Sequence, residues 1–225
     1  MRMQPRIKLH IKPHINQAFL VVAIFAIATL LTPTQSLVAD DETPPHYVFP
    51  FSKVAVNYPR DHIDYPAVDV EGCYAHVLAP TSGVISQTRK IDTWTKAADT
   101  PGTRGGKTIT LLGDDNVRYY FAHLGRVKVV TGQYVGAGDW IGVMGASGNA
   151  SITRCHTHVG ISRTCTLAEV FLLQGEIWPQ KYLDAWREGN QLSPTKEKNA
   201  IVKRDPLGCT RSRADTQAAL AQKAG

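Results

Sequence analysis

Between Tyr47 and Arg163 the chain is divided into short segments rich in Val, Ile, Tyr and Thr, and this division most restricts the folds open to it. Turn-forming residues separate these segments, for example at Pro80–Gly83 and Gly113–Asn116. Strands of this length and spacing favour an antiparallel, mainly β fold, either a sandwich or a partial barrel. The predicted strands are Val68–Val70, Gly83–Gln87, Lys107–Leu112, Val117–Ala122, Trp140–Met144 and His158–Ser162.

The pattern changes after Cys165. Leu167–Gln174 and Gln180–Gly189 have the spacing of helices, and Gly189 stands where a helix commonly ends on glycine. Arg213–Ala224 is interpreted as a short helix or a loose tail. We therefore expect a short helical C-terminal extension after the β domain.

The N-terminus has the features of an export signal. Residues 1–16 contain four basic residues and no acid, and an apolar run follows from Ala18 to Leu31. A helix of this length spans about 21 Å, less than the ~30 Å hydrocarbon core of a bilayer. The sequence therefore predicts a secretory signal cleaved near Ser36 or Ala39, with an uncleaved signal anchor as the alternative. Either way the protein is expected to be secreted, periplasmic or in the cell envelope.

The charge of the chain depends on this signal. The first 39 residues hold four of the 25 basic residues and none of the 19 acidic ones, so removing them lowers the net charge from +6 to +2. The high isoelectric point therefore does not indicate nucleic acid binding. We expect a monomer that contacts a membrane only if the signal is retained. The predicted parts are a signal, a linker, a β domain, a helical extension and a tail, at 1–39, 40–46, 47–165, 166–210 and 211–225.

An even number of cysteines in an exported chain predicts disulfides. Metal binding by the same residues is the alternative, but the chain has no C-x₂-C sequence. Four cysteines allow three pairings, and the sequence does not choose among them. The four are Cys73, Cys155, Cys165 and Cys209.

His62 and Asp69 lie seven residues apart on either side of Pro66, which favours a bend between them. Asp69 alternates with the apolar residues Val68 and Val70 in a predicted strand. A carboxylate inside an apolar strand is costly unless it is paired or binds a cation. This segment has the features of a metal site, although a surface turn with a stray acid has the same pattern.

His156 and His158 are two residues apart, so a strand would place both rings on one face, about 7 Å apart, with Thr157 pointing away. One ring could then bind a metal while the other reaches a bound water or a substrate. Two surface histidines on an edge strand would have the same spacing. His123 ends an aromatic-rich segment before a turn at Gly125, and a lone histidine in this setting is usually structural.

Taken together, these segments contain the ligands that a catalytic zinc ion needs, because such an ion takes three protein ligands and keeps one open position. The chain has no H-E-x-x-H sequence, so no glutamate is placed to accept the proton of a zinc-bound water. His123 and His156 are the candidates for this acid–base role. His46, in the linker, and His76 are interpreted as uninvolved and structural, respectively.

The order of these motifs resembles the lysostaphin-like (LytM-type) zinc peptidoglycan endopeptidases, in their actinobacterial-type branch. The resemblance covers about residues 60–163, and Ile177–Arg187 looks like the C-terminal sequence of actinobacterial members. The matching segments are His62 with Asp69, Gly83–Ile85, Phe121–Leu124, Gly132–Gly142 with Ser147–Gly148, and His156–Val159.

The resemblance implies an antiparallel β-sheet groove in which His62, Asp69 and His158 bind Zn²⁺. It implies that His123 and His156 are catalytic histidines, as acid–base groups or as oxyanion stabilisers. It implies a zinc metalloendopeptidase that hydrolyses peptide bonds in peptidoglycan stem peptides or cross-bridges with a zinc-activated water. The alternative is a non-catalytic envelope protein of the same fold that binds peptidoglycan or activates another hydrolase. Neither the motifs nor the fold specify which peptide bond is cut.

The chain departs from the family pattern at three points. The His–Asp spacing is stretched to seven residues, which leaves Asp64 as a second candidate ligand. The histidine pair reads His-Thr-His-Val instead of His-Leu-His-Phe, so the side chains behind the strand, Thr157 and Val159, are smaller. The aromatic residue that the family often places near the oxyanion is not identifiable, and Tyr58 and Tyr65 are the candidates.

Overall fold

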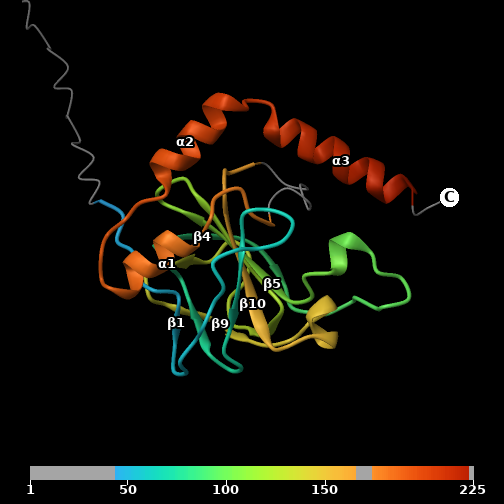
Figure 1. Ribbon diagram of the computed structural model, residues 1–225, viewed down its shortest axis with the longest axis horizontal. Coiled ribbons are helices and arrows are strands. Elements are labelled where there is room, and N and C mark those ends of the chain that lie inside the picture. The colour runs from blue at the N-terminus through green and yellow to red at the C-terminus, as the bar shows by residue number, and fades with distance from the viewer. Residues whose placement is uncertain (1–43, 166–173, 223–225) are drawn as a thin grey trace, which may run out of the picture. The chain divides into compact units, whose positions relative to one another are not determined.

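The computed structural model describes residues 44–165 and 174–222 (Figure 1). The predicted signal and nearly all of the predicted helix Leu167–Gln174 lie outside these residues. In the part of the chain that is described, no helix is both long and apolar enough to cross a membrane. Of the predicted linker, residues 44–46 are described, and they are exposed without regular structure.

The strands form two antiparallel sheets, and this confirms the predicted mainly β fold. The first sheet has the order β1 (Phe51–Ser52), β3 (His76–Leu78), β9 (Trp140–Met144) and β7 (Leu124–Val127). The second sheet has the order β2 (Val68–Glu71), β10 (His156–Ser162), β6 (Arg118–Ala122), β5 (Thr108–Gly113), β4 (Gly83–Arg89) and β8 (Tyr134–Val135).

The register of the second sheet determines what lies beside the predicted histidine pair. β10 runs between β2 and β6, so His158 is paired with Asp69 on one side and with Ala122 on the other. In β2, Val68 and Val70 are fully buried whereas Asp69 is only half-buried, as the alternation of a strand requires. The Asp69 carboxylate therefore lies directly beside the His158 ring on the neighbouring strand of the same sheet.

All six predicted strands are present, with ends shifted by at most two residues. The strands β1, β3, β7 and β8, of two to four residues each, were not predicted. Their identity as strands depends on pairing with distant partners.

Three helices follow the sheets: α1 (Gln180–Arg187), α2 (Thr195–Arg204) and α3 (Gly208–Gln222). The prediction for α1 is confirmed, and Gly189 beyond its end has a φ of +82°, which glycine adopts without strain. α2 was not predicted, because it buries only Lys198 and Ile201 and has no apolar stripe. α3 begins five residues before the expected Arg213.

The C-terminal extension is anchored to the β domain by packing and by ionic contacts. Trp186 of α1 belongs to the main hydrophobic core and stacks on Tyr47, with ring centroids 5.4 Å apart. Arg163, only 4% exposed, pairs with Glu176 at 2.9 Å and with Asp205 at 3.5 Å. The first contact ties α1 to the β domain, and the second ties the end of α2 to the residue that follows β10.

The structure selects one of the open cysteine pairings. Cys165 and Cys209 form a disulfide across 44 residues, and closing a loop of that length contributes about 4 kcal/mol in the chain-entropy model. Cys73 and Cys155 are free thiols that line one cavity of about 460 Å³. Burial, reinforced by the neighbouring Cys73 thiol, raises the pKa of Cys155 to about 12.

Candidate metal centre and catalytic site

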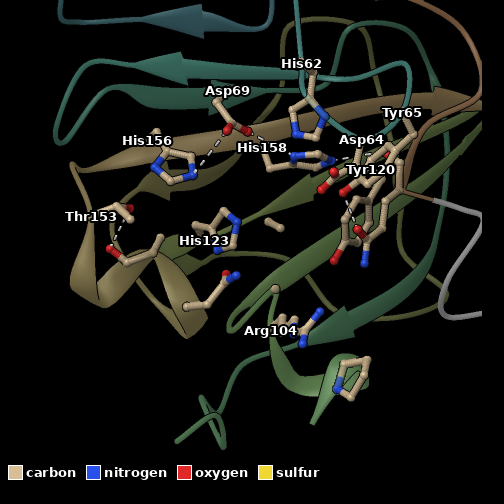
Figure 2. A pocket seen from close by; sticks show the side chains of 16 residues that line it. His62, Asp64, Tyr65, Asp69, Arg104, Tyr120, His123, Thr153, His156 and His158 are labelled. Carbon is tan, nitrogen blue, oxygen red and sulfur yellow. Dashed lines mark hydrogen bonds and ion pairs between the residues drawn. The ribbon is translucent and has the colours of Figure 1, made fainter. Parts of the chain in front are cut away.

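A cavity of about 460 Å³ brings together all five residues that the sequence singled out. Figure 2 shows their side chains facing this cavity from β2, β10 and the loops around them. The rest of the lining includes Tyr65, Tyr120, Arg104 and Gln174. The five residues are His62, Asp69, His123, His156 and His158.

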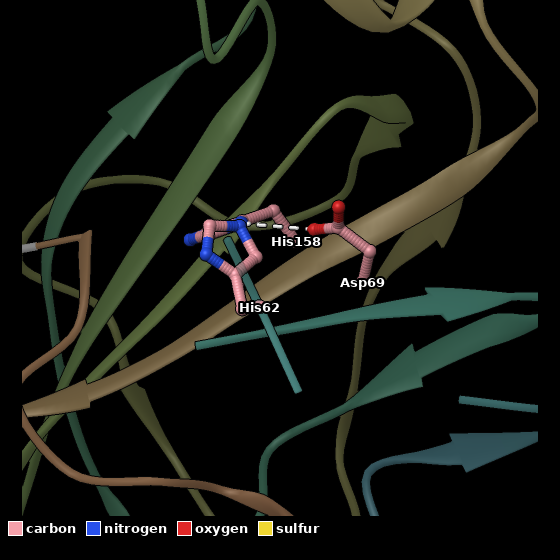
Figure 3. A group of neighbouring side chains, drawn as sticks. All are labelled: His62, Asp69 and His158. Carbon is pink, nitrogen blue, oxygen red and sulfur yellow. Dashed lines mark hydrogen bonds and ion pairs between the residues drawn. The ribbon is translucent and has the colours of Figure 1, made fainter. Parts of the chain in front are cut away.

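Three of the five offer ligand atoms to a common point (Figure 3). One ligand atom each from His62, Asp69 and His158 lies within 4.8 Å of the other two. His158 Nδ1 is 3.0 Å from Asp69 Oδ1, and the rings of His62 and His158 meet edge to face with centroids 5.2 Å apart. The other candidate ligand, Asp64, is exposed at the cavity wall and does not belong to this group of described residues.

The chemistry of these three donors fits a zinc ion. Two imidazole nitrogens and one carboxylate oxygen are ligands that Zn²⁺ takes in catalytic sites. His62 Nδ1 is buried without a hydrogen-bond partner among the described residues, as an atom that would bind a metal ion is expected to be. Although burial opposes ionisation, the close contact with His158 and the neighbouring His156 and His62 rings hold the pKa of Asp69 at about 2. The Asp69 carboxylate is therefore ionised at neutral pH.

The two remaining histidines lie side by side, with ring centroids 4.7 Å apart. His123 Nδ1 is 2.9 Å from the carbonyl oxygen of Ser147, and His156 Nδ1 is 2.7 Å from that of Arg154. A carbonyl oxygen only accepts hydrogen bonds, so each Nδ1 carries a hydrogen. Each Nε2 is left to accept or deliver a proton, and that of His156 lies 3.9 Å from Asp69 Oδ2.

The backbone at His123 is unusual. Its φ of +61° lies in the left-handed region, which is uncommon for a residue other than glycine. The His123 N–H donates to Gly105 and its carbonyl accepts from Ser147, so two loops hold the residue in this conformation. Strained backbone held in this way is typical of functional sites. The turn between β6 and β7 thus directs the His123 ring into the cavity.

Burial, together with the neighbouring His156 and His158, lowers the pKa of His123 to about 4. Only 8% of the residue is exposed. At pH 7 His123 is therefore neutral, and its Nε2 can accept a proton. A neutral ring has no positive charge with which to stabilise an oxyanion, and the only hydrogen of the His123 ring is already donated to Ser147.

This pKa predicts how stability depends on pH in the metal-free protein. An unfolded chain protonates His123 near pH 6.5, whereas the folded chain resists protonation until about pH 4. The stabilising contribution is therefore complete above pH 6.5 and is lost as the pH falls toward 4, by about 3 kcal/mol. Urea unfolding with chelator at pH 7 and pH 4 should show a smaller loss for His123→Asn than for the wild type. Equal losses in the two proteins would contradict the buried, neutral state of His123.

The structure separates the two tyrosines proposed for the oxyanion. Tyr58 is buried outside the cavity lining and donates to Asp184 at 2.7 Å, so this candidate is wrong. Tyr65 does line the cavity, where its hydroxyl donates to the side chain of Gln174.

Sequence reasoning missed Tyr120, Arg104 and Gln174. Tyr120 could have been found from strand alternation, because it shares a face of β6 with Ala122, which pairs with His158. Arg104 is held at the cavity by a two-point ion pair with Asp99, and no local sequence signal indicates this. His76 lies apart from the cavity lining and stacks on Trp140 at 4.0 Å, in keeping with a structural role.

Two antiparallel sheets that place two histidines and an aspartate beside a second pair of histidines define a lysostaphin-like peptidase fold. Residues 65–169 match Peptidase family M23. The matched segment begins three residues after His62, which only the tertiary structure places beside Asp69 and His158.

Solved structures are similar in fold at low identity. A proposed glycyl-glycine endopeptidase LytM from Ruminococcus gnavus has 20% identity and a TM-score of 0.51, with 65% of this chain and 62% of that chain covered. Lysostaphin from Staphylococcus simulans, an antimicrobial peptidase, has 23% identity and a TM-score of 0.45, with 59% of this chain covered. This chain spans only half the length of that lysostaphin chain. No curated protein matches the sequence.

Proposed function

We propose that this chain is a zinc metalloendopeptidase that hydrolyses peptide bonds in peptidoglycan stem peptides or cross-bridges. The observation that carries the proposal is the convergence of His62, Asp69 and His158 within 4.8 Å, beside His123 and His156 in one cavity. The match of residues 65–169 to Peptidase family M23 supports peptide hydrolysis, and the motif order that resembles the lysostaphin-like peptidoglycan endopeptidases supports a cell-wall substrate.

In this proposal the three ligands hold the ion and the other two histidines move the proton. A bound zinc ion supplies Lewis acidity, which polarises a peptide carbonyl and lowers the pKa of water. The His123 ring is neutral at pH 7, so its Nε2 accepts a proton from the attacking water while the water oxygen bonds to the carbonyl carbon of the peptide. The same proton is then returned to the departing amine as the C–N bond breaks. His156, 4.7 Å away between ring centroids, shares this proton transfer.

The surroundings of the site support the division between ligands and proton carriers. His158 is 4% exposed and lies on β10, where the neighbouring strands β2 and β6 fix its position. His156 is at the first residue of the same strand and is half-buried, so it has access to a substrate in the cavity. We further propose that the protein acts outside the cytoplasm as a monomer, in keeping with its predicted export signal.

The test is mass analysis of fragments released from defined peptidoglycans, with directly cross-linked and glycyl-bridged polymers compared. The purified protein with zinc should release peptides with new amino and carboxyl termini. Chelator should abolish the release and added zinc should restore it. Bound zinc without cleavage of either polymer would contradict the proposal and favour a non-catalytic wall-binding protein.

A further inference from the structure

Gln174, which lies beyond the segment matched to family M23, contacts one of the proposed ligands. Its backbone carbonyl oxygen is 3.0 Å from His158 Nε2. Its side-chain Oε1 accepts a hydrogen bond from the Tyr65 hydroxyl. The C-terminal extension therefore forms part of the wall of the candidate metal centre.

Two glycines allow this segment to approach so closely. A Cβ atom at Gly160, two residues after His158 on β10, would lie 1.8 Å from the Gln174 carbonyl oxygen. A Cβ atom at Gly175 would lie 1.8 Å from the carbonyl oxygen of Pro66. Distances this short exclude any side chain, so both positions require glycine for Gln174 to keep its place.

Further contacts hold the segment against β10. The backbone N–H groups of Glu176 and Ile177 both donate to the carbonyl of Ile161, at 2.9 and 3.0 Å. The Glu176 carboxylate accepts from the backbone N–H of Arg163 at 3.0 Å and from its guanidinium at 2.9 Å. Arg163 also donates to the carbonyl of Asp205 at 2.5 Å, which links the segment to the C-terminal end of α2.

The position of the Gln174 carbonyl has a chemical consequence for His158. A neutral imidazole has one N–H, and a carbonyl oxygen can only accept it. Donation from Nε2 to Gln174 therefore leaves the lone pair of Nδ1, the nitrogen that faces Asp69, free for a cation. Hydrogen bonds of this kind fix the tautomer and orientation of metal-binding histidines.

We propose that Gln174 is a positioning residue for the metal centre, and that its backbone carbonyl holds His158 in the zinc-binding tautomer. This inference rests on the proposed zinc function. It makes the C-terminal extension part of the metal site, held in place through Arg163 and the two glycines.

The test measures zinc affinity by chelator competition on the full chain. Gly160→Ala and Gly175→Ala both displace the Gln174 carbonyl, and each should weaken zinc binding by about 10- to 100-fold. Gln174→Ala keeps the backbone carbonyl and is expected to retain zinc. Gly136→Ala is the matched control, because its Cβ would meet nothing closer than Asp139 Oδ2 at 3.7 Å. Thermal unfolding of the metal-free variants shows whether each one folds.

Nitrogen-15 NMR of the zinc-loaded wild type gives a readout that does not depend on the variants. The hydrogen on His158 should be on Nε2. A hydrogen on Nδ1, or undiminished zinc affinity in both folded glycine variants, would overturn the role of Gln174. A wild-type chain that binds no zinc at all would instead contradict the proposed function.

Discussion

An Asp69→Ala chain is expected to lose its zinc and its peptidase activity together. The Asp69 carboxylate is ionised, with a pKa of about 2, and its oxygen is the anionic member of the proposed ligand set. Without it, two imidazoles remain, and zinc sites in enzymes use three protein ligands. His158→Ala should have the same effect, because it removes the most buried of the three proposed ligands. Zinc content after dialysis and peptide release from peptidoglycan measure the two losses.

Asp64→Ala is the matched control for this experiment. Asp64 lines the same cavity and was the rival ligand, but the structure leaves it exposed and outside the converging group. Its removal should leave zinc stoichiometry unchanged. If Asp69→Ala kept one zinc per chain while Asp64→Ala lost it, the ligand assignment would be wrong. Asp64, two residues from His62, would then be the ligand in place of Asp69.

A His123→Asn chain should keep its zinc yet lose about 10²- to 10⁴-fold in turnover, the usual contribution of one acid–base group. The His123 ring lies 6.3 Å from that of His158 between centroids, and its Nδ1 is bonded to Ser147, so its removal leaves the three ligands in place. Asparagine is the better replacement than alanine, because it tolerates the φ of +61° at this turn. Turnover on a defined peptidoglycan fragment, measured beside zinc content, separates the two effects.

His76→Ala serves as the comparison for His123→Asn. His76 stacks on Trp140 away from the cavity, so its loss should leave turnover close to that of the wild type. Near-normal turnover in His123→Asn would remove His123 from the mechanism. A simultaneous loss of zinc would mean that His123 supports the ligands and does not act on the proton.

The predicted site depended on residue type and local spacing, which a sequence displays directly. The two-residue spacing of His156 and His158 places both on one face of a strand, and β10 does begin at His156. The alternation around Asp69 likewise predicted a carboxylate at the surface of an apolar strand, as β2 shows. Strand periodicity and ligand chemistry are local properties, so these predictions did not require knowledge of the fold.

Other features depend on contacts between distant segments. Tyr58 and Tyr65 are equally plausible in the sequence, yet one is bonded to Asp184 and the other lines the cavity. The pairing of Cys165 with Cys209 follows from how the extension returns to the end of β10. The short strands β1 and β8 exist only because longer strands pair with them.

The sequence by itself determined the mainly β fold, the resemblance to the lysostaphin-like family and the five histidine and aspartate candidates, because periodicity and motif order are local properties of the chain. Only the tertiary structure decided that His62 joins Asp69 and His158 and that Asp64 does not. It alone brought Gln174 to the Nε2 atom of His158. The physical reason is that strand register and loop packing set the distances between residues that are remote in sequence, and no local pattern encodes those distances.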